Sequence, residues 1–296
     1  MFPYPLPAIP DYRPLASLAF AVSPRGTVYA LASTIRSEHA DKPKPAYFIV
    51  KYKDDGTVDS YFRVGDEPDK RIQPLRMAVF GDGNFMLSGT AMLDDGPGTF
   101  SGVFDRQGTF LTPLKLGEVV DRQRPVAASA RAESRAESKP PEPSRVKQLE
   151  SEGKNPVGLA SSTLGFGLQD GNVYVLRGTS EATLYVVSSA GEIIRSYRLK
   201  PPEPGMSPLQ MAGAGVGYLF IYYGRMNVSV TADSPAQPDY IRVLNSETGE
   251  EAAIYRVVQA ETHFDVPACA QSSDVFLFLG ASEDNQHLEV VHYVAR

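Results

Sequence analysis

The chain has a single cysteine, Cys269, and no tryptophan among its 296 residues. One cysteine cannot form a disulfide within the chain. Cys269 lies among small residues at the start of an expected strand, where a buried, unreactive thiol is the simpler interpretation and a catalytic nucleophile is the alternative. The lack of tryptophan removes the largest aromatic platform on which a sugar ring can stack.

Long apolar runs and an excess of positive charge are also missing. No stretch approaches the roughly 20 apolar residues of a membrane-spanning helix, and residues 1–7 contain neither the basic region nor the apolar core of a secretory signal. With 29 Lys and Arg against 35 Asp and Glu, the net charge is −6, which disfavours binding to nucleic acid through a basic surface. We therefore expect a soluble, cytoplasmic monomer, or an exported protein if the natural start lies upstream.

What the sequence does contain is one pattern repeated five times. Each copy has an apolar strand, a tight turn, an aromatic-rich strand, a loop, a third strand, a second tight turn and, except in the fifth copy, a fourth strand. Glycine ends the tight turns, where it permits the positive φ that short hairpins need. These glycines are Gly26, Gly83, Gly171 and Gly217 in the first turns and Gly56, Gly108, Gly191 and Gly249 in the second.

Regular short strands with paired turns favour four-stranded blades, because one blade cannot bury both of its faces alone. We therefore predict an all-β fold, a five-bladed β-propeller of four-stranded antiparallel blades, as a single domain over residues 1–296. The fifth copy stops at Arg296 in its third strand, and Tyr4 to Ile9 resembles the fourth strand of the third copy around Tyr197. The N-terminal strand is thus expected to pair with residues 288–293, complete the last blade and close the ring.

The third copy carries a family resemblance. Asp170-Gly-Asn-Val-Tyr-Val, followed by Leu184-Tyr-Val-Val-Ser-Ser-Ala-Gly-Glu-Ile-Ile-Arg-Ser-Tyr, resembles an NHL-type repeat, and the chain is similar more broadly to the TolB-like propellers of bacteria. The resemblance implies a bacterial propeller protein. That superfamily includes enzymes, receptors and scaffolds, so the resemblance implies no particular activity.

Residues 117–156 differ in composition from the rest of the chain. They hold almost no large apolar side chain, and their positive and negative charges nearly balance. Such a segment cannot offset the entropy of ordering by burial, so we predict a disordered insertion between two blades. A tether or a partner-binding segment is the alternative interpretation.

The links between strands fall on two faces of the expected propeller. The tight turns within each blade share one face, which we call the tight-turn face. The longer, irregular links share the opposite long-loop face, and binding residues collect on long loops of a rigid scaffold. The candidate binding residues on the long-loop face are Arg36, His39, Arg71, Arg225, His263 and Asp265.

Motifs for catalysis or metal binding are weak. Carboxylates near His39 and His263 could orient an imidazole for base or ligand work, although solvated loop polarity explains both equally well. His287 and His292 are expected on opposite faces of one strand, where they cannot bind one metal ion. No Gly-x-Ser-x-Gly elbow, phosphate loop or paired-cysteine spacing occurs. We therefore predict no cofactor and no metal site.

The leading functional hypothesis is a non-enzymatic propeller that binds a protein or peptide partner through its long-loop face. The alternative is a hydrolase or lyase, or a sensor of a small ligand or sugar, with its site at the mouth of the central channel. Convergent carboxylates or histidines would favour an enzyme, whereas a broad apolar or mixed patch would favour a partner.

Overall fold

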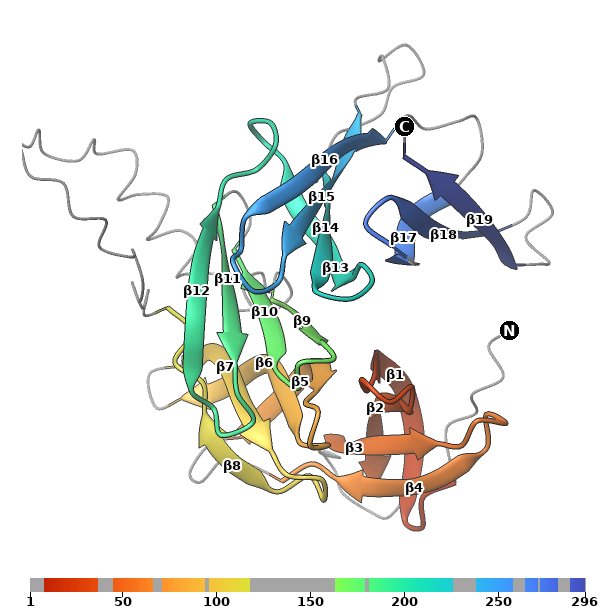
Figure 1. Ribbon diagram of the computed structural model, residues 1–296. Helices are drawn as coiled ribbons and strands as arrows, with labels where there is room; N and C mark the ends of the chain where they lie inside the picture. Colours follow the sequence, from red (N-terminus) through yellow and green to blue (C-terminus); the bar gives the residue numbers. More distant parts are fainter. Residues whose placement is uncertain are drawn as a thin grey trace, which may run out of the picture.

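The chain forms five antiparallel sheets in sequence order (Figure 1). The computed structural model describes residues 8–36, 45–65, 71–93, 96–117, 163–178, 181–225, 238–257, 264–270, 272–281 and 288–295. In each sheet, every strand pairs with the next strand along the chain. The first sheet contains β1 (Tyr12–Val22), β2 (Val28–Arg36), β3 (Pro45–Tyr52) and β4 (Val58–Arg63). The second contains β5 (Arg71–Val79), β6 (Phe85–Leu93), β7 (Gly96–Phe104) and β8 (Phe110–Pro113).

The other three sheets continue the same meander. The third contains β9 (Leu164–Gly167), β10 (Val173–Arg177), β11 (Ala182–Val187) and β12 (Ile193–Leu199). The fourth contains β13 (Ser207–Gly213), β14 (Tyr218–Gly224), β15 (Asp239–Asn245) and β16 (Glu251–Val257). The fifth contains β17 (Phe264–Ala270), β18 (Val275–Ala281) and β19 (Leu288–Val294).

The first strand of each sheet lies on the inner side of the arrangement (Figure 1). These inner strands contact one another in chain order, β1 with β5, β5 with β9, β9 with β13 and β13 with β17. A parallel bridge between Ala214 and Ala270 joins the fourth sheet to the fifth. The all-β propeller with four-stranded antiparallel blades is therefore confirmed.

The predicted number of complete blades is wrong. Four sheets have the four strands of a blade, whereas the fifth sheet has three. The described part of the chain thus forms four four-stranded blades, blades 1 to 4, followed by the three-stranded sheet β17–β19. Of the predicted insertion 117–156, all but Gly117 lies outside the described residues.

Closure of the ring by the N-terminal strand is not evident either. Tyr4 lies outside the described residues, but Ile9 belongs with blade 1 and not with β19. The backbone N–H of Tyr12 donates to the carbonyl oxygen of Ile9 at 3.0 Å, and Asp11 adopts a φ of 64°. This tight turn folds the chain back, so that Ile9 is only 6% exposed and clusters with Phe48. A local turn therefore directs residues 8–11 onto the first sheet.

The tight turns follow their predicted chemistry. All eight predicted turn glycines have φ between 72° and 91°. A turn carboxylate or amide often accepts a backbone N–H two residues later, as where Asp82 Oδ1 accepts from Asn84 at 2.9 Å and Asp170 Oδ1 accepts from Asn172 at 3.0 Å. These turns are set by local sequence, and they hold the strand ends of neighbouring blades close together.

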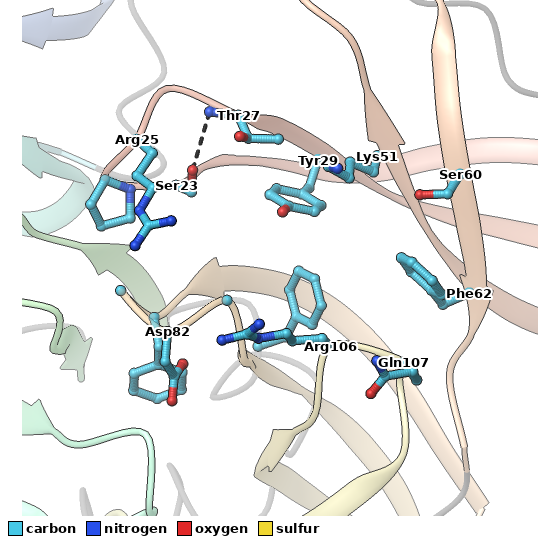
Figure 2. Close-up of a pocket in the computed structure, with 15 residues that line it drawn as sticks. Ser23, Arg25, Thr27, Tyr29, Lys51, Ser60, Phe62, Asp82, Arg106 and Gln107 are labelled. Carbon is cyan, nitrogen blue, oxygen red and sulfur yellow. Dashed lines mark hydrogen bonds between the residues drawn. The ribbon is translucent and has the colours of Figure 1, made fainter.

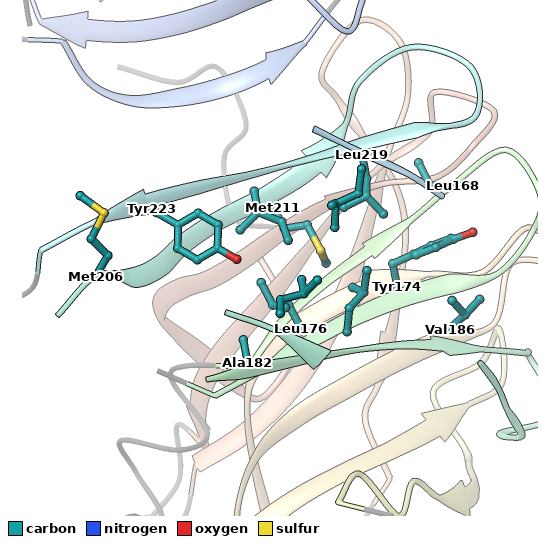
Figure 3. Close-up of a cluster of buried hydrophobic side chains, with 13 residues drawn as sticks. Leu168, Tyr174, Leu176, Ala182, Val186, Met206, Met211, Leu219 and Tyr223 are labelled. Atoms are coloured by element: carbon teal, nitrogen blue, oxygen red, sulfur yellow. The ribbon is translucent and has the colours of Figure 1, made fainter. Parts of the chain in front are cut away.

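The hydrophobic core consists of clusters between consecutive blades. Each cluster combines buried side chains from two facing sheets, and the cluster between blades 3 and 4 is shown in Figure 3. Representative members from facing sheets are Leu31 and Phe85, Phe80 and Val173, Leu176 and Leu219, and Phe220 and Phe276.

The face of blade 1 that points away from blade 2 differs from this pattern. Its buried residues, Ala30, Ala32, Val50 and Tyr52, cluster only with other side chains of blade 1 in the described part of the chain. The register places Phe20 opposite Ala30 and Val22 opposite Val28 on this same face. Phe20 is 51% exposed and Val22 is 47% exposed. We call this surface, formed by Phe20, Val22, Ala30, Ala32 and Val50, the open face of blade 1, because no sheet of the described residues packs against it. Ala30, Ala32 and Val50 are themselves at most 1% exposed.

No helix that could cross a membrane occurs among the described residues.

Candidate functional site

The six predicted binding residues are only partly described. His39 and His263 lie outside the described residues, and Asp265 lies within β17. Arg36 ends β2 and Arg71 begins β5, and both are exposed at the long-loop ends of their strands. Arg225 follows β14. These three arginines come from three different blades, and no hydrogen bond or ion pair within the described ranges links them.

Arg225 forms hydrogen bonds with the link that precedes β13 in its own blade. Its guanidinium donates to Glu203 Oε2 at 2.7 Å and to the carbonyl oxygen of Pro204 at 2.9 Å. The hydroxyl of Tyr240 donates to the other carboxylate oxygen of Glu203 at 2.5 Å. This hydrogen bond from Tyr240, together with the charge of Arg225, lowers the pKa of Glu203 below its usual value. Arg225 therefore ties the link before β13 to the end of β14, and its role in binding stays a prediction.

Two pockets formed by described residues lie on the tight-turn face, opposite to the face that the loop lengths favoured. The first, which we call the blade 1–2 pocket, has a volume of about 430 Å³ between the turns of blades 1 and 2 (Figure 2). The second, which we call the blade 3–4 pocket, has a volume of about 580 Å³ between the turns of blades 3 and 4. Both volumes fall within the roughly 300–1,000 Å³ typical of small-molecule sites.

Three cationic side chains line the blade 1–2 pocket. Arg25 comes from the β1–β2 turn, Lys51 from β3 and Arg106 from the β7–β8 turn. The pocket also contains the ring of Tyr29, which packs edge-on against Phe85 at a centroid distance of 5.2 Å. Partial burial raises the pKa of Tyr29, so its hydroxyl remains a neutral hydrogen-bond donor at physiological pH.

The blade 3–4 pocket contains polar groups that pair with one another. The hydroxyl of Tyr174 lies 2.9 Å from Asp170 Oδ2 and 3.1 Å from the carbonyl oxygen of Ser246. Arg195 and Tyr197 both donate to the carbonyl oxygen of Glu247, at 2.5 and 2.7 Å. These bonds join blade 3 to the β15–β16 turn of blade 4.

Tyr174 is poorly suited to act as a base. Burial, followed by the hydrogen bond to the Asp170 carboxylate, raises the pKa of Tyr174 well above its usual value. Its hydroxyl therefore stays protonated at neutral pH and donates a hydrogen bond to Asp170. We interpret the Tyr174–Asp170 pair as a structural link between blades and not as a catalytic pair.

Tyr174→Phe is expected to lower the free energy of unfolding by about 1–2 kcal/mol. The variant keeps the buried ring but leaves the Asp170 carboxylate and the Ser246 carbonyl without this donor. Urea denaturation measures the change. Tyr218→Phe is the matched control, because its hydroxyl makes no hydrogen bond with the described residues, and it should stay close to wild type. Equal stabilities of the two variants would contradict the structural role of Tyr174.

Sequence analysis missed the residues of the blade 1–2 pocket because it treated tight turns as connections only. A signal was nevertheless present in the turn composition. Arg25 directly precedes the turn glycine Gly26, and Arg106 stands two residues before Gly108. In a propeller, turns of neighbouring blades lie side by side on one face, so basic residues in the turns of two consecutive copies predict a cationic site between them.

Among the described residues, no group of three or more His, Cys, Asp and Glu side chains is placed to hold a metal ion.

Comparisons with known proteins give the chain no family. No family model matches it, and no curated protein matches it. A protein of unknown function from Bacteroides caccae is similar over 98% of this chain and 80% of its own, with 11% identity and a TM-score of 0.43. The polysaccharide lyase Uly1 is similar over 95% of this chain and 57% of its own, with 8% identity and a TM-score of 0.44.

A third solved structure is the β-propeller domain of the Trilobed protease from Pyrococcus furiosus. It covers 96% of this chain and 69% of its own, with 9% identity and a TM-score of 0.43. Similarities at this level assign no activity to this chain, and the NHL-type or TolB-like family is not confirmed. The order and pairing of the strands identify the fold as an all-β propeller.

Proposed function

We propose that the protein is a non-enzymatic β-propeller that binds a protein or peptide partner. The observation that carries the proposal is the open face of blade 1. Among the described residues, no sheet packs against the open face, and Phe20 and Val22 are about half exposed there, while Ala30, Ala32 and Val50 on the same face are buried. Contiguous exposed apolar side chains at a rigid sheet are typical of protein-interaction surfaces.

The energetics favour covering this face. Burying the exposed halves of Phe20 and Val22 would contribute on the order of 1 kcal/mol each. The open face thus offers two partly exposed apolar side chains on a rigid sheet, which suits an extended peptide or a sheet from a partner.

The long-loop face remains a predicted second location for partner binding. Its candidates His39 and His263 lie in links outside the described residues. The hydrolase or lyase alternative, with its site at the mouth of the central channel, remains a second candidate; the Tyr174–Asp170 pair of the blade 3–4 pocket does not supply a base for it, because Tyr174 stays protonated.

A photo-reactive amino acid at position 20 tests the proposal. The residue replaces Phe20, and irradiation is carried out in the cells that naturally make the protein. A crosslinked adduct of discrete, higher mass is expected. The matched control places the same amino acid at Ile194, which is 39% exposed on the outer strand of blade 3. That control should yield no such adduct.

Three outcomes would contradict partner binding at the open face. The first is the absence of any adduct at position 20, and the second is the same adduct at position 194. The third is an internal crosslink from position 20 to residues 272–295, which would mean that the fifth sheet covers blade 1 and closes the ring. Mass spectrometry of the crosslinked peptides separates these outcomes. An adduct of twice the chain mass would show that the partner is a second copy of this chain and not a different protein.

A further inference from the structure

The blade 1–2 pocket has an unusual charge balance for a chain with a net charge of −6. Of the charged side chains that line it, Arg25, Lys51 and Arg106 are cationic, and Asp82 is anionic. A concave surface that concentrates one sign of charge attracts ligands of the opposite sign. The question is which of these charges are available to a ligand.

Two of the four charges are already engaged. Lys51 Nζ forms an ion pair with Asp59 Oδ2 at 2.7 Å, on the neighbouring strand. The oxygens of Asp82 accept hydrogen bonds from the backbone N–H and the side-chain amide of Asn84, at 2.9 and 3.3 Å. Asp82 is therefore occupied in shaping its own turn.

Arg25 and Arg106 are the available cations. Within the described residues, neither guanidinium forms a hydrogen bond or an ion pair. Figure 2 shows their side chains reaching into the pocket from the turns on its two sides. A guanidinium presents a rigid fork of donors that matches the oxygens of phosphate, sulfate or carboxylate. Two such forks on opposite sides of one pocket can hold a single oxyanion between them.

The β5–β6 turn positions Arg106. A Cβ atom at Gly83 would lie 3.2 Å from Arg106 Nε and 3.5 Å from its Cδ and Cγ, so the side chain of Arg106 packs directly over this glycine. Packing along the stem restricts the side chain and directs its charged end, which lowers the entropy lost when a ligand binds.

One wall of the pocket is aromatic. Tyr29, Phe62 and Phe85 contribute to the lining beside the cations. The neutral hydroxyl of Tyr29, which has no hydrogen bond within the described ranges, offers a further donor. A ligand that joins an oxyanion to a ring would satisfy the arginines and cover the aromatic wall at the same time.

We infer from this arrangement that the blade 1–2 pocket is a binding site for a small organic oxyanion with an aromatic or other ring-shaped body. This site is separate from the open face of blade 1 and adds a ligand-binding function to the proposed partner binding. Because both guanidinium groups are exposed to water, an inorganic anion alone should bind weakly. The ring supplies the remaining affinity.

Isothermal titration calorimetry at constant ionic strength tests the site, with inorganic phosphate, phenyl phosphate and phenol as probes. Phenyl phosphate should bind the wild-type chain more tightly than inorganic phosphate, and phenol should bind less tightly than phenyl phosphate. Arg106→Gln should weaken binding of both phosphate probes by about tenfold, because it removes one set of charge-assisted hydrogen bonds. Arg25→Gln provides a second variant with the same expectation, so the test does not depend on one variant folding normally.

Arg63→Gln is the matched control. Arg63 is exposed on β4 of the same blade and does not line the pocket, so this variant removes one positive charge and should leave binding nearly unchanged. The absence of binding by both phosphate probes at millimolar concentrations would overturn the inference. Equal losses of affinity in Arg63→Gln and Arg106→Gln would mean that only the overall charge of the protein matters. Equal binding of phenol and phenyl phosphate would exclude an anion site.

Discussion

Gly167→Ala is expected to lower the free energy of unfolding by about 3 kcal/mol or more. A Cβ atom at position 167 would lie 2.0 Å from the carbonyl oxygen of Val79 and 3.2 Å from its carbonyl carbon. Both atoms belong to the backbone of the inner strand of blade 2, which cannot move aside as a side chain can. The methyl group would therefore force β9 away from β5 and open the interface between blades 2 and 3.

The close approach extends to the adjoining turns. The backbone N–H of Gly81 donates to the carbonyl oxygen of Gly171 at 2.9 Å, and a Cβ atom at Gly81 would lie 2.6 Å from the Cα of Gly171. Displacing β9 would also strain this hydrogen bond. The cost of Gly167→Ala should therefore exceed the cost of a single crowded methyl group.

Gly165→Ala is the control for Gly167→Ala. Gly165 lies two residues earlier in β9, but its Cβ atom would meet only side chains, Ala78 Cβ at 3.2 Å and Met86 Sδ at 3.4 Å. Methionine adapts readily to a new neighbour. We expect the stability of this variant to stay within about 1 kcal/mol of wild type. Urea denaturation measures both variants, and the comparison requires that the unfolding free energy depends equally steeply on urea concentration in each. Similar losses of stability in the two variants would refute the proposed backbone contact.

These glycines also illustrate what the sequence could and could not predict. The turn at Asp170, Gly171 and Asn172 was predictable, because its hydrogen bonds and its positive φ arise within a few residues. The need for glycine at position 167 was not predictable, because it depends on Val79 in another blade. The strand pattern reports local conformation, whereas the approach of two blades depends on packing between segments distant in sequence.

The same distinction explains the error in ring closure. Tyr4 to Ile9 resembles an outer strand in residue type, but pairing with β19 would require a particular path between distant ends of the chain. The positive φ of Asp11 and the hydrogen bond from Tyr12 to Ile9 direct Ile9 onto blade 1 instead. A turn of four residues, and not the similarity between repeats, thus sets the position of Ile9.

The candidate site shows a third limit of prediction from the sequence. Loop length favoured the long-loop face, whose links lie largely outside the described residues, whereas the blade 1–2 and blade 3–4 pockets lie on the tight-turn face. Arg25 and Arg106 are about 80 residues apart in the sequence, and only the side-by-side placement of blades 1 and 2 brings them to one pocket. Sequence analysis could identify the turns but could not pair them without the arrangement of the sheets.

Phe220→Ala is expected to lower the free energy of unfolding by about 3–5 kcal/mol. Phe220 on β14 is fully buried, and its ring packs edge-on against Phe276 of β18 at a centroid distance of 5.8 Å. This pair lies in the cluster that joins blade 4 to the fifth sheet. Removing the ring leaves a cavity in that interface and deprives Phe276 of its aromatic partner.

The fifth sheet should respond more strongly than the rest of the fold to the loss of Phe220. With three strands and one clustered interface, β17–β19 depends on blade 4 for its burial among the described residues. Hydrogen exchange should therefore accelerate more at Val275–Ala281 than at Phe85–Leu93, which lies in blade 2 and shares no described cluster with blade 4. Ile254→Ala, at a position 42% exposed in the same blade, should change stability by less than about 1 kcal/mol. Uniform acceleration across both strands would mean that the fifth sheet unfolds only with the whole propeller.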